Sequence, residues 1–265
     1  MRWQSVGHDG RPGCSQGGWR PPSRRASAAP PSPSTRPHRV PAPLERRRRQ
    51  ATLKSLIDNA RSFAATHVAD PHNEAAFRAL EAGQSPEALF VTCSDSRVVP
   101  ALITGARPGE LFELRTAGNV VPPYPAAGID GRADGPMSEA ATIEYAVCVL
   151  GVRDIVVCGH SHCGAVGALV RREDLSAVPA VRDWLEHSVG PDAALRSLAA
   201  TSPDVAEAVQ THVLAQVERL HTYPCVRERV ADNSLTLHAW YYEVHTGTVS
   251  AHRPSDTGRA SFSPL

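Results

Sequence analysis

Two short segments of the chain combine residue types that bind a soft metal ion. Segment 92–97, Thr-Cys-Ser-Asp-Ser-Arg, contains Cys93, and segment 158–164, Cys-Gly-His-Ser-His-Cys-Gly, contains His160 and Cys163. A cysteine thiolate is a strong ligand for such metals, and His160 and Cys163 have metal-ligand spacing. Together the three residues form a Cys2His set. Such a set leaves one position of a tetrahedral zinc ion open, which is typical of catalytic zinc sites.

The first segment also pairs an acid with a base. Arg97 stands two residues after Asp95, and a guanidinium at that spacing can hold the carboxylate ionised and fixed. Phosphatases with a loop cysteine place their arginine six residues after it, whereas Arg97 stands four residues after Cys93, so that loop is too short. A plainer alternative is a buried cysteine beside a surface ion pair. His162, next to Cys163, is expected at the surface or at a helix cap.

An apolar run precedes each segment, and both runs are typical of buried strands. The first is 88–91, Ala-Leu-Phe-Val, and the second is 155–157, Ile-Val-Val. Strands alternate with helical patterns, which predicts a single α/β domain with a mostly parallel sheet flanked by helices. In such sheets ligands bind beyond the carboxyl ends of the strands, where the strand order reverses. A 2-1-3-4 strand order would bring Cys93 and His160 together at that point.

The other elements follow from apolar periodicity, helix caps and turn residues. We predict helices that start near residue 51 and residue 73, a strand at 111–116, a helix at 138–150, two helices within 175–199, one from 202 to 220 and a short one at 224–231. A strand at 235–244 leads through a turn into an antiparallel edge strand at 249–252. The proline- and glycine-rich stretch 122–136 predicts a long loop.

The first fifty residues differ in composition from the rest. They hold eleven arginines, nine prolines and two acidic residues, a net charge of +9, whereas the whole chain carries +1. Such a segment cannot bury enough apolar surface to offset chain entropy, so we expect residues 1–50 to be disordered. We divide the chain into this basic leader, a zinc-dependent catalytic domain at 51–252 and a frayed tail at 253–265.

Composition also limits the cellular setting. The basic run 46–49 suits a solvated tail better than a tether to nucleic acid or to an anionic membrane, so we expect no nucleic-acid partner. No apolar run approaches the ~18 residues that span a bilayer, and no secretory signal is visible. An arginine-rich, acid-poor leader also has the composition of an organelle transit peptide, and that alternative stays open. The six cysteines lack the spacing of a disulfide framework, which favours a cytoplasmic location.

The pattern Cys-x-Asp-x-Arg followed by His-x-x-Cys resembles the beta-class carbonic anhydrases. The likeness extends from about Ala51 to His252. Three flanking segments agree with it: Arg115-Thr116-Ala117-Gly118-Asn119, Ile143-Glu144-Tyr145-Ala146 and His238-Ala239-Trp240-Tyr241-Tyr242.

Carried over residue by residue, the resemblance implies one Zn²⁺ per chain, bound by Cys93, His160 and Cys163. It gives the catalytic pair that orients the zinc-bound water as Asp95 and Arg97. It places four residues at the substrate: Gln84, Phe112, Tyr145 and Gly164. These four match the plant-type branch. The other branch has a tryptophan three residues before the first ligand, where this chain has Phe90. Tyr145 would come from a partner chain, which implies a homodimer or a higher even oligomer.

The activity that the resemblance implies is the reversible hydration of carbon dioxide to bicarbonate and a proton by zinc-bound hydroxide. Two alternatives stay open. One is a hydrolase of carbon disulfide or carbonyl sulfide with the same fold and ligands. The other is a non-catalytic zinc-binding module, although such a module normally closes its fourth position with protein, and no fourth cysteine or histidine has suitable spacing.

Overall fold

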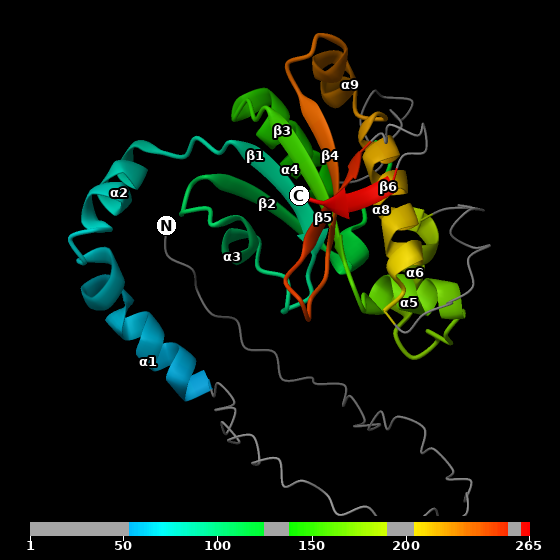
Figure 1. Ribbon diagram of the computed structural model, residues 1–265, viewed down its shortest axis with the longest axis horizontal. Coiled ribbons are helices and arrows are strands. Elements are labelled where there is room, and N and C mark those ends of the chain that lie inside the picture. The colour runs from blue at the N-terminus through cyan, green and yellow to red at the C-terminus, as the bar shows by residue number, and fades with distance from the viewer. Residues whose placement is uncertain (1–52, 125–137, 190–203, 254–260) are drawn as a thin grey trace, which may run out of the picture. The chain divides into compact units, whose positions relative to one another are not determined.

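A computed structural model describes residues 53–124, 138–189, 204–253 and 261–265. Within these ranges six strands form one sheet in the order β2-β1-β3-β4-β5-β6 (Figure 1). Strands β1 to β4 are parallel, and β5 and β6 pair antiparallel. The strands are β1 Ala88–Cys93, β2 Leu111–Thr116, β3 Asp154–His160, β4 Thr236–Tyr242, β5 Val249–Arg253 and β6 Ser261–Pro264. The predicted 2-1-3-4 order with an antiparallel strand at β5 is confirmed.

The C-terminal residues correct one expectation. We predicted a frayed tail at 253–265, but Ser261–Pro264 form β6 and pair with β5. The ring of Phe262 lies 5.3 Å from that of His252 on the paired strand. A short strand here satisfies backbone groups that β5 would otherwise expose as the edge of the sheet.

The helices agree with most of the periodic patterns. Their bounds are α1 Leu53–Phe63, η1 Ala64–Val68, α2 Glu74–Ala79, η2 Leu80–Ala82, α3 Pro100–Thr104, η3 Ala117–Asn119, α4 Ser138–Glu144, η4 Tyr145–Val149, α5 Gly164–Arg171, α6 Pro179–Val189, α8 Ala206–Leu220 and α9 Pro224–Ala231. The single helix predicted at 138–150 therefore ends in a π-helical turn, η4. The second helix predicted within 175–199, the leader 1–50 and most of the loop 122–136 lie outside the described residues.

The central strands are buried on both faces of the sheet. Every residue of β1 is buried, which accounts for its continuous apolar run. One face carries Leu89 and Val91 into the main core, where α4, α5, α8 and α9 contribute apolar residues. The other face carries Phe90, whose ring meets that of Trp240 edge-on at 5.9 Å. The sheet is therefore a rigid support for whatever stands at its strand ends.

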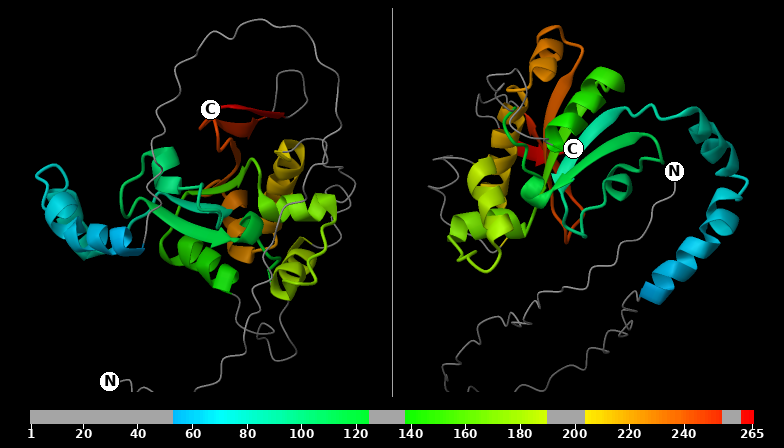
Figure 2. Two further views of the ribbon diagram at one scale, coloured as in Figure 1. Left: turned by 90° about the horizontal axis from the view of Figure 1, so that it is seen from below. Right: turned by 180° about the vertical axis from the view of Figure 1, so that it is seen from behind.

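Close packing of α8 against β3 depends on one glycine. A Cβ atom on Gly159 would lie 2.5 Å from Cγ1 of Val209 and 2.6 Å from Cγ2 of Val213. Both valines belong to α8, which runs beside β3 and β4 (Figure 2). Gly159 immediately precedes His160, so this contact fixes the strand end that carries the histidine. No helix among the described residues is both long and apolar enough to cross a membrane.

Candidate metal centre

The carboxyl ends of β1 and β3 bring the two sequence segments together. Cys93 is the last residue of β1 and His160 the last of β3, and these strands are hydrogen-bonded neighbours. Cys163 lies at the cap position before α5. The ligand atoms of the three side chains all lie within 4.8 Å of one another, and all three residues are buried. The structure therefore gathers the predicted ligand set into one cluster.

The hydrogen bonding of His160 fits a metal ligand. Its Nδ1 lies 2.9 Å from the carbonyl oxygen of Ser161, so Nδ1–H donates and the Nε2 lone pair is left free. Among the described residues, Nε2 is buried without a hydrogen-bond partner. A buried polar atom without a partner is costly, and a metal ion facing the two thiols would satisfy it. Two cysteines and one histidine are ligands that zinc prefers, so the donor set fits zinc.

The thiols of Cys93 and Cys163 shift each other's pKa in opposite directions. The hydrogen bond from the Cys163 thiol lowers the pKa of Cys93 the most, burial opposes it, and His160 and the backbone N–H groups of Asp95 and Gly118 lower it further. The same hydrogen bond, together with burial, raises the pKa of Cys163. The pair is thus arranged to hold one thiolate on Cys93. A metal cation would displace the remaining proton.

Asp95 and Arg97 form a bidentate pair at the edge of this cluster. Arg97 donates from Nε to Oδ1 at 2.9 Å and from Nη2 to Oδ2 at 2.7 Å, and its backbone N–H donates to Oδ1 at 2.9 Å. These contacts hold the pKa of Asp95 well below its usual range. Oδ2 lies 3.9 Å from His160 Nε2. An ionised carboxylate is therefore fixed beside the ligand atoms.

Arg97 also connects the two segments. Its Nη2 donates to the carbonyl oxygen of His162 at 3.1 Å, so one guanidinium joins the loop after β1 to the loop after β3. His162 has a left-handed backbone with φ 56° and an exposed side chain, as expected for a residue that points away from the ligands.

Sequence reasoning missed a second supporting arginine. We used Arg115 only as part of a flanking segment. In the structure it donates from Nη2 to the carbonyl oxygens of Cys93 at 2.9 Å, Asp95 at 2.9 Å and Val98 at 2.7 Å. Three converging carbonyl groups fix the shape of the loop that carries Cys93 and Asp95. The sequence offered one indication of this role, namely that Arg115 stands near the end of the strand beside β1.

A buried polar pair on α8 fixes the segment that follows β2. His212 Nε2 lies 2.8 Å from the carbonyl oxygen of Gly118, and Gln216 accepts from the Val121 N–H at 2.9 Å. Gly118 is one of the residues whose N–H lowers the pKa of Cys93. The four-residue spacing of His212 and Gln216 on one helix face could have indicated this clamp.

Three of the four predicted substrate residues lie far from these ligands. Cys93 pairs with Thr116 at the ends of β1 and β2, whereas Phe112 pairs with Leu89. Phe112 stands four positions before Thr116 along the strand, which is about 13 Å. The Tyr145 ring lies 5.9 Å from that of Phe112, and Gln84 precedes the start of β1.

Only Gly164, next to Cys163, stands at the ligand end of the sheet. Gln84, Phe112 and Tyr145 therefore belong to the opposite end, and one chain alone does not bring them to its own metal centre.

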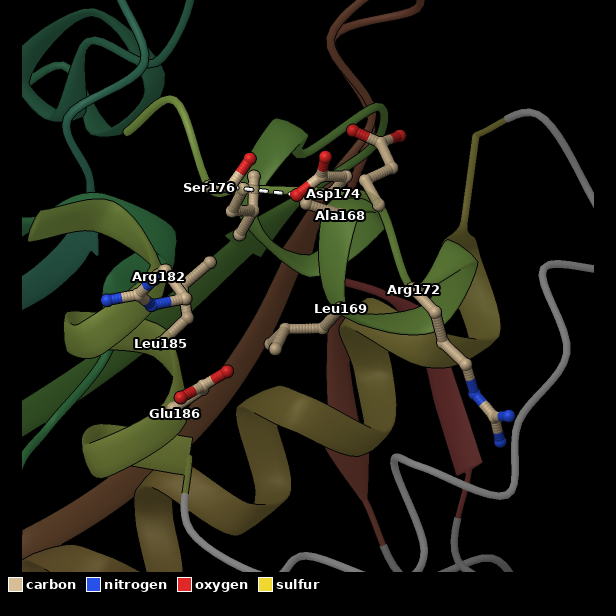
Figure 3. Close-up of a pocket in the computed structure, with 10 residues that line it drawn as sticks. Ala168, Leu169, Arg172, Asp174, Ser176, Arg182, Leu185 and Glu186 are labelled. Carbon is tan, nitrogen blue, oxygen red and sulfur yellow. Dashed lines mark hydrogen bonds between the residues drawn. The ribbon is translucent and has the colours of Figure 1, made fainter. Parts of the chain in front are cut away.

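Two hollows lie near the described elements. One of about 300 Å³ is lined by Ser94, Arg115, Thr116, Trp184 and neighbours, so it adjoins the Cys93 loop. The other, about 390 Å³, lies between α5 and α6 and is lined by Leu169, Leu185 and a mixture of acidic and basic side chains (Figure 3). In it, Asp174 accepts from the Ser176 N–H at 2.9 Å. None of the metal-centre residues lines this second hollow.

Comparisons with known proteins agree on one family. A family model described as carbonic anhydrase matches residues 88–249. The carbonic anhydrase of Pseudomonas aeruginosa is 42% identical over 205 residues, which cover 75% of this chain and 87% of the relative. Carbonic anhydrase 1 of Escherichia coli O157:H7 is 39% identical over 221 residues, covering 80% of this chain and 92% of the relative.

Solved structures give the same result. The structure of the beta-carbonic anhydrase CcaA matches with a TM-score of 0.68 and 35% identity, covering 79% of this chain and 98% of that one. One of two tetrameric beta-carbonic anhydrases from Sordaria macrospora matches with a TM-score of 0.61 and 27% identity, covering 78% and 98%.

Proposed function

Because the chain belongs to the beta-class carbonic anhydrases, we propose that Cys93, His160 and Cys163 hold one zinc ion at which carbon dioxide and bicarbonate interconvert. The observation that carries this proposal is the clustering of three buried ligand atoms within 4.8 Å. The free Nε2 of His160 supports it. Zinc bound there would lower the pKa of a water ligand to about 7 and so supply a nucleophile at neutral pH.

Asp95 orients the reacting water in this proposal. An ionised carboxylate can only accept hydrogen bonds, so the water must direct a proton at Asp95 and a lone pair toward carbon dioxide. Arg97 donates a hydrogen bond to each carboxylate oxygen of Asp95 and keeps the carboxylate ionised. The Asp95–Arg97 pair thereby reduces the orientations open to the nucleophile, which is how positioned groups accelerate such reactions.

The substrate pocket is completed by a second copy of the chain. Phe112 and Tyr145 provide apolar surface for carbon dioxide, and Gln84 can donate to an oxygen of bicarbonate. All three lie at the end of the sheet opposite to the chain's own ligands. We therefore propose a homodimer or a higher even oligomer in which each chain supplies these residues to its partner. The Sordaria macrospora relative is described as tetrameric, which is compatible with this assembly.

Helix α1 offers a surface for that partner. It contains no buried residue, and its apolar stripe is open to solvent, with Leu53 73%, Leu56 54% and Ile57 41% exposed. An amphipathic helix gains most of its stability by burying such a stripe. We propose that α1 packs on the partner chain. We also propose that residues 51–252 form the catalytic domain and that the protein works in the cytoplasm.

We expect sedimentation velocity to show at least a dimer. Leu56→Asp places a charge in the α1 stripe, so it shifts the protein toward monomers and lowers the hydration rate by about tenfold or more, while the zinc content stays at one per chain. Asn59→Asp adds the same charge at an exposed position of the same helix and leaves assembly intact. A fully active monomer of the unmodified protein would disprove the shared pocket.

A stopped-flow hydration assay on the zinc-loaded protein tests the activity itself. We expect saturable hydration of carbon dioxide that disappears on removal of zinc by a chelator and returns when zinc is restored. Parallel reactions with carbon disulfide and carbonyl sulfide decide whether the substrate range is wider. A protein that binds zinc with full occupancy yet hydrates none of the three would be a non-catalytic zinc module instead.

A further inference from the structure

The π-helical turn η4 presents Tyr145 at the surface of the chain. Tyr145 is its first residue and is 45% exposed, with its ring beside that of Phe112. The two residues that follow, Ala146 and Val147, are buried in the main core. A π-helical turn bonds a carbonyl to the N–H five residues later instead of four, so its side chains point in other directions than in an α-helix. The direction of Tyr145 therefore depends on the contacts that keep η4 in this shape.

A side chain of α9 completes the hydrogen bonding of η4. The carbonyl oxygen of Tyr145 accepts from the Leu150 N–H at 2.9 Å, and that of Ala146 accepts from the N–H six residues later at 3.1 Å. The next carbonyl oxygen, that of Val147, accepts from Nη1 of Arg229 at 2.8 Å. Carbonyl groups at the end of a helix need partners from outside the helix, and Arg229 is that partner for η4.

Arg229 is itself fixed by the turn that leads from α9 into β4. Its Nε donates to Oγ of Ser234 at 3.0 Å, and its Nη2 donates to the carbonyl oxygen of Ser234 at 3.1 Å. The backbone carbonyl oxygen of Arg229 accepts from the N–H groups of Ser234 and Leu235, both at 2.9 Å. A planar guanidinium with several bonds in fixed directions has little freedom to rotate. Arg229 therefore joins η4 rigidly to the start of β4.

We propose that Arg229 is a positioning residue for the reaction at the metal centre of the partner chain and that it acts through Tyr145. This inference rests on the proposed function, in which each chain supplies Tyr145 to its partner. Without Arg229, the carbonyl group of Val147 loses its donor and η4 relaxes toward α-helical geometry. That change turns Tyr145 away from the direction in which it faces the partner's substrate.

The size of the effect follows from how Tyr145 is held on its other side. A displacement of about 1 Å at a group that borders the substrate can cost about 100-fold in rate. The residue before Tyr145, Glu144, accepts a hydrogen bond from the Tyr124 hydroxyl at 2.9 Å, and this contact does not involve Arg229. Tyr145 is therefore only partly released when Arg229 is replaced, and we expect a loss of about 5- to 20-fold in kcat/KM.

Hybrid oligomers test this inference because they show which chain feels the change. Two versions of the full chain are co-expressed with different affinity tags, and the oligomers that contain both versions are purified. One version carries Cys93→Ser, so only the other version binds zinc. Hydration rates of these hybrids are expressed per zinc ion, and the zinc content of each preparation is measured by elemental analysis.

Arg229→Gln is then placed in one version or the other. In the version without zinc, it disturbs the Tyr145 that serves the active metal centre, and we expect kcat/KM per zinc to fall about 5- to 20-fold. In the version that binds zinc, the disturbed Tyr145 serves the inactive centre, and the rate should equal that of the unmodified hybrid. Arg227→Gln, at an exposed position of α9, should leave both hybrids unchanged.

The inference is overturned if Arg229→Gln lowers the rate when it stands in the zinc-binding version, because Arg229 then acts on the fold of its own chain. It is also overturned if neither hybrid slows. Tyr145→Ala in the same two arrangements tests the proposed function separately. A loss when Tyr145→Ala stands in the zinc-binding version disproves the shared pocket, whereas a loss from the other version without any effect of Arg229→Gln removes only the role of Arg229.

A second variant keeps the test decisive if Arg229→Gln does not fold. Ser234→Ala changes an exposed residue and removes the Oγ that accepts from Nε of Arg229. It loosens the guanidinium without removing it, so we expect a loss of about threefold from the zinc-free version and none from the zinc-binding version. The reverse pattern, or no loss in either hybrid, overturns the inference in the same way.

Discussion

Replacing Cys93 by serine is expected to remove most of the zinc and to lower the hydration rate by more than about 100-fold. A neutral hydroxyl then replaces the thiolate, which is the ligand form of cysteine. The backbone N–H groups of Asp95 and Gly118 that lower the pKa of Cys93 would face an oxygen that carries no charge. The loss should be larger than for a supporting residue such as Arg115, because a direct ligand is removed.

Zinc per chain, measured by elemental analysis after dialysis, is the primary observable for Cys93→Ser. Cys158→Ser is the matched control, since Cys158 is also buried and lies opposite Thr92 on the neighbouring strand, but is not among the ligands. That control should keep its zinc, and circular dichroism should show that both variants fold. Full zinc occupancy in Cys93→Ser would remove Cys93 from the ligand set.

The position of the metal centre could be predicted from sequence because it depends on strand ends. Continuous apolar runs identify β1 and β3 as buried parallel strands, and parallel strands present their carboxyl ends at one edge. Cys93 and His160 stand at those two ends, so parallel pairing of β1 with β3 is enough to bring them together. The three-residue step from His160 to Cys163 adds the last ligand by local geometry alone.

The supporting contacts could not be predicted in this way. Arg115 binds three carbonyl oxygens, and His212 reaches Gly118 from a helix 94 residues away. Such contacts depend on tertiary packing: the four-residue spacing of His212 and Gln216 shows that they share a helix face, but not which loop that face meets. β6 was missed for a related reason, since a short Ser-Phe-Ser stretch forms a strand only because the β5 edge is available.

The predicted substrate residues show what a match of sequence positions to a family leaves out, namely where each residue lies relative to the metal centre of its own chain. Gln84, Phe112 and Tyr145 were assigned to one pocket with Cys93, with only Tyr145 expected from a partner. The parallel register places Phe112 opposite Leu89, four residues before the metal end. Phe112 and Gln84 therefore accompany Tyr145 at the opposite end of the sheet. A sequence match identifies residue types for a pocket, but only the register of the strands shows how far they stand from the chain's own ligands.

Replacing Arg97 by alanine is expected to lower kcat/KM for hydration by about 10- to 100-fold at unchanged zinc content. Two side-chain hydrogen bonds to Asp95 disappear, as does the bond to the carbonyl oxygen of His162. Asp95 then samples more orientations and holds the reacting water less well. Because Cys93, His160 and Cys163 are untouched, the zinc content separates this effect from that of Cys93→Ser.

The pH profile shows whether the loss comes from orientation or from charge. Arg97 depresses the pKa of Asp95 in the folded protein, so the ion pair contributes stability above the unfolded carboxyl pKa and loses it as pH falls through the lower folded value. Without Arg97 the Asp95 pKa returns upward toward the ordinary value of about 3.9. That is still far below the titration near 7 that controls the nucleophile. Arg97→Ala should therefore keep the shape of the wild-type profile between pH 6 and pH 9 and lower only its height.

Arg107→Ala provides the matched control for this prediction. Arg107 donates to Glu110 through its side chain at 3.0 Å and through its backbone N–H at 2.8 Å, much as Arg97 does with Asp95. Its side chain is 74% exposed, and a surface pair of this kind contributes little to stability. The control should retain full activity. If Arg97→Ala instead shifts the midpoint of the profile, Arg97 acts through the charge of the centre, and the orienting role of the Asp95–Arg97 pair is wrong.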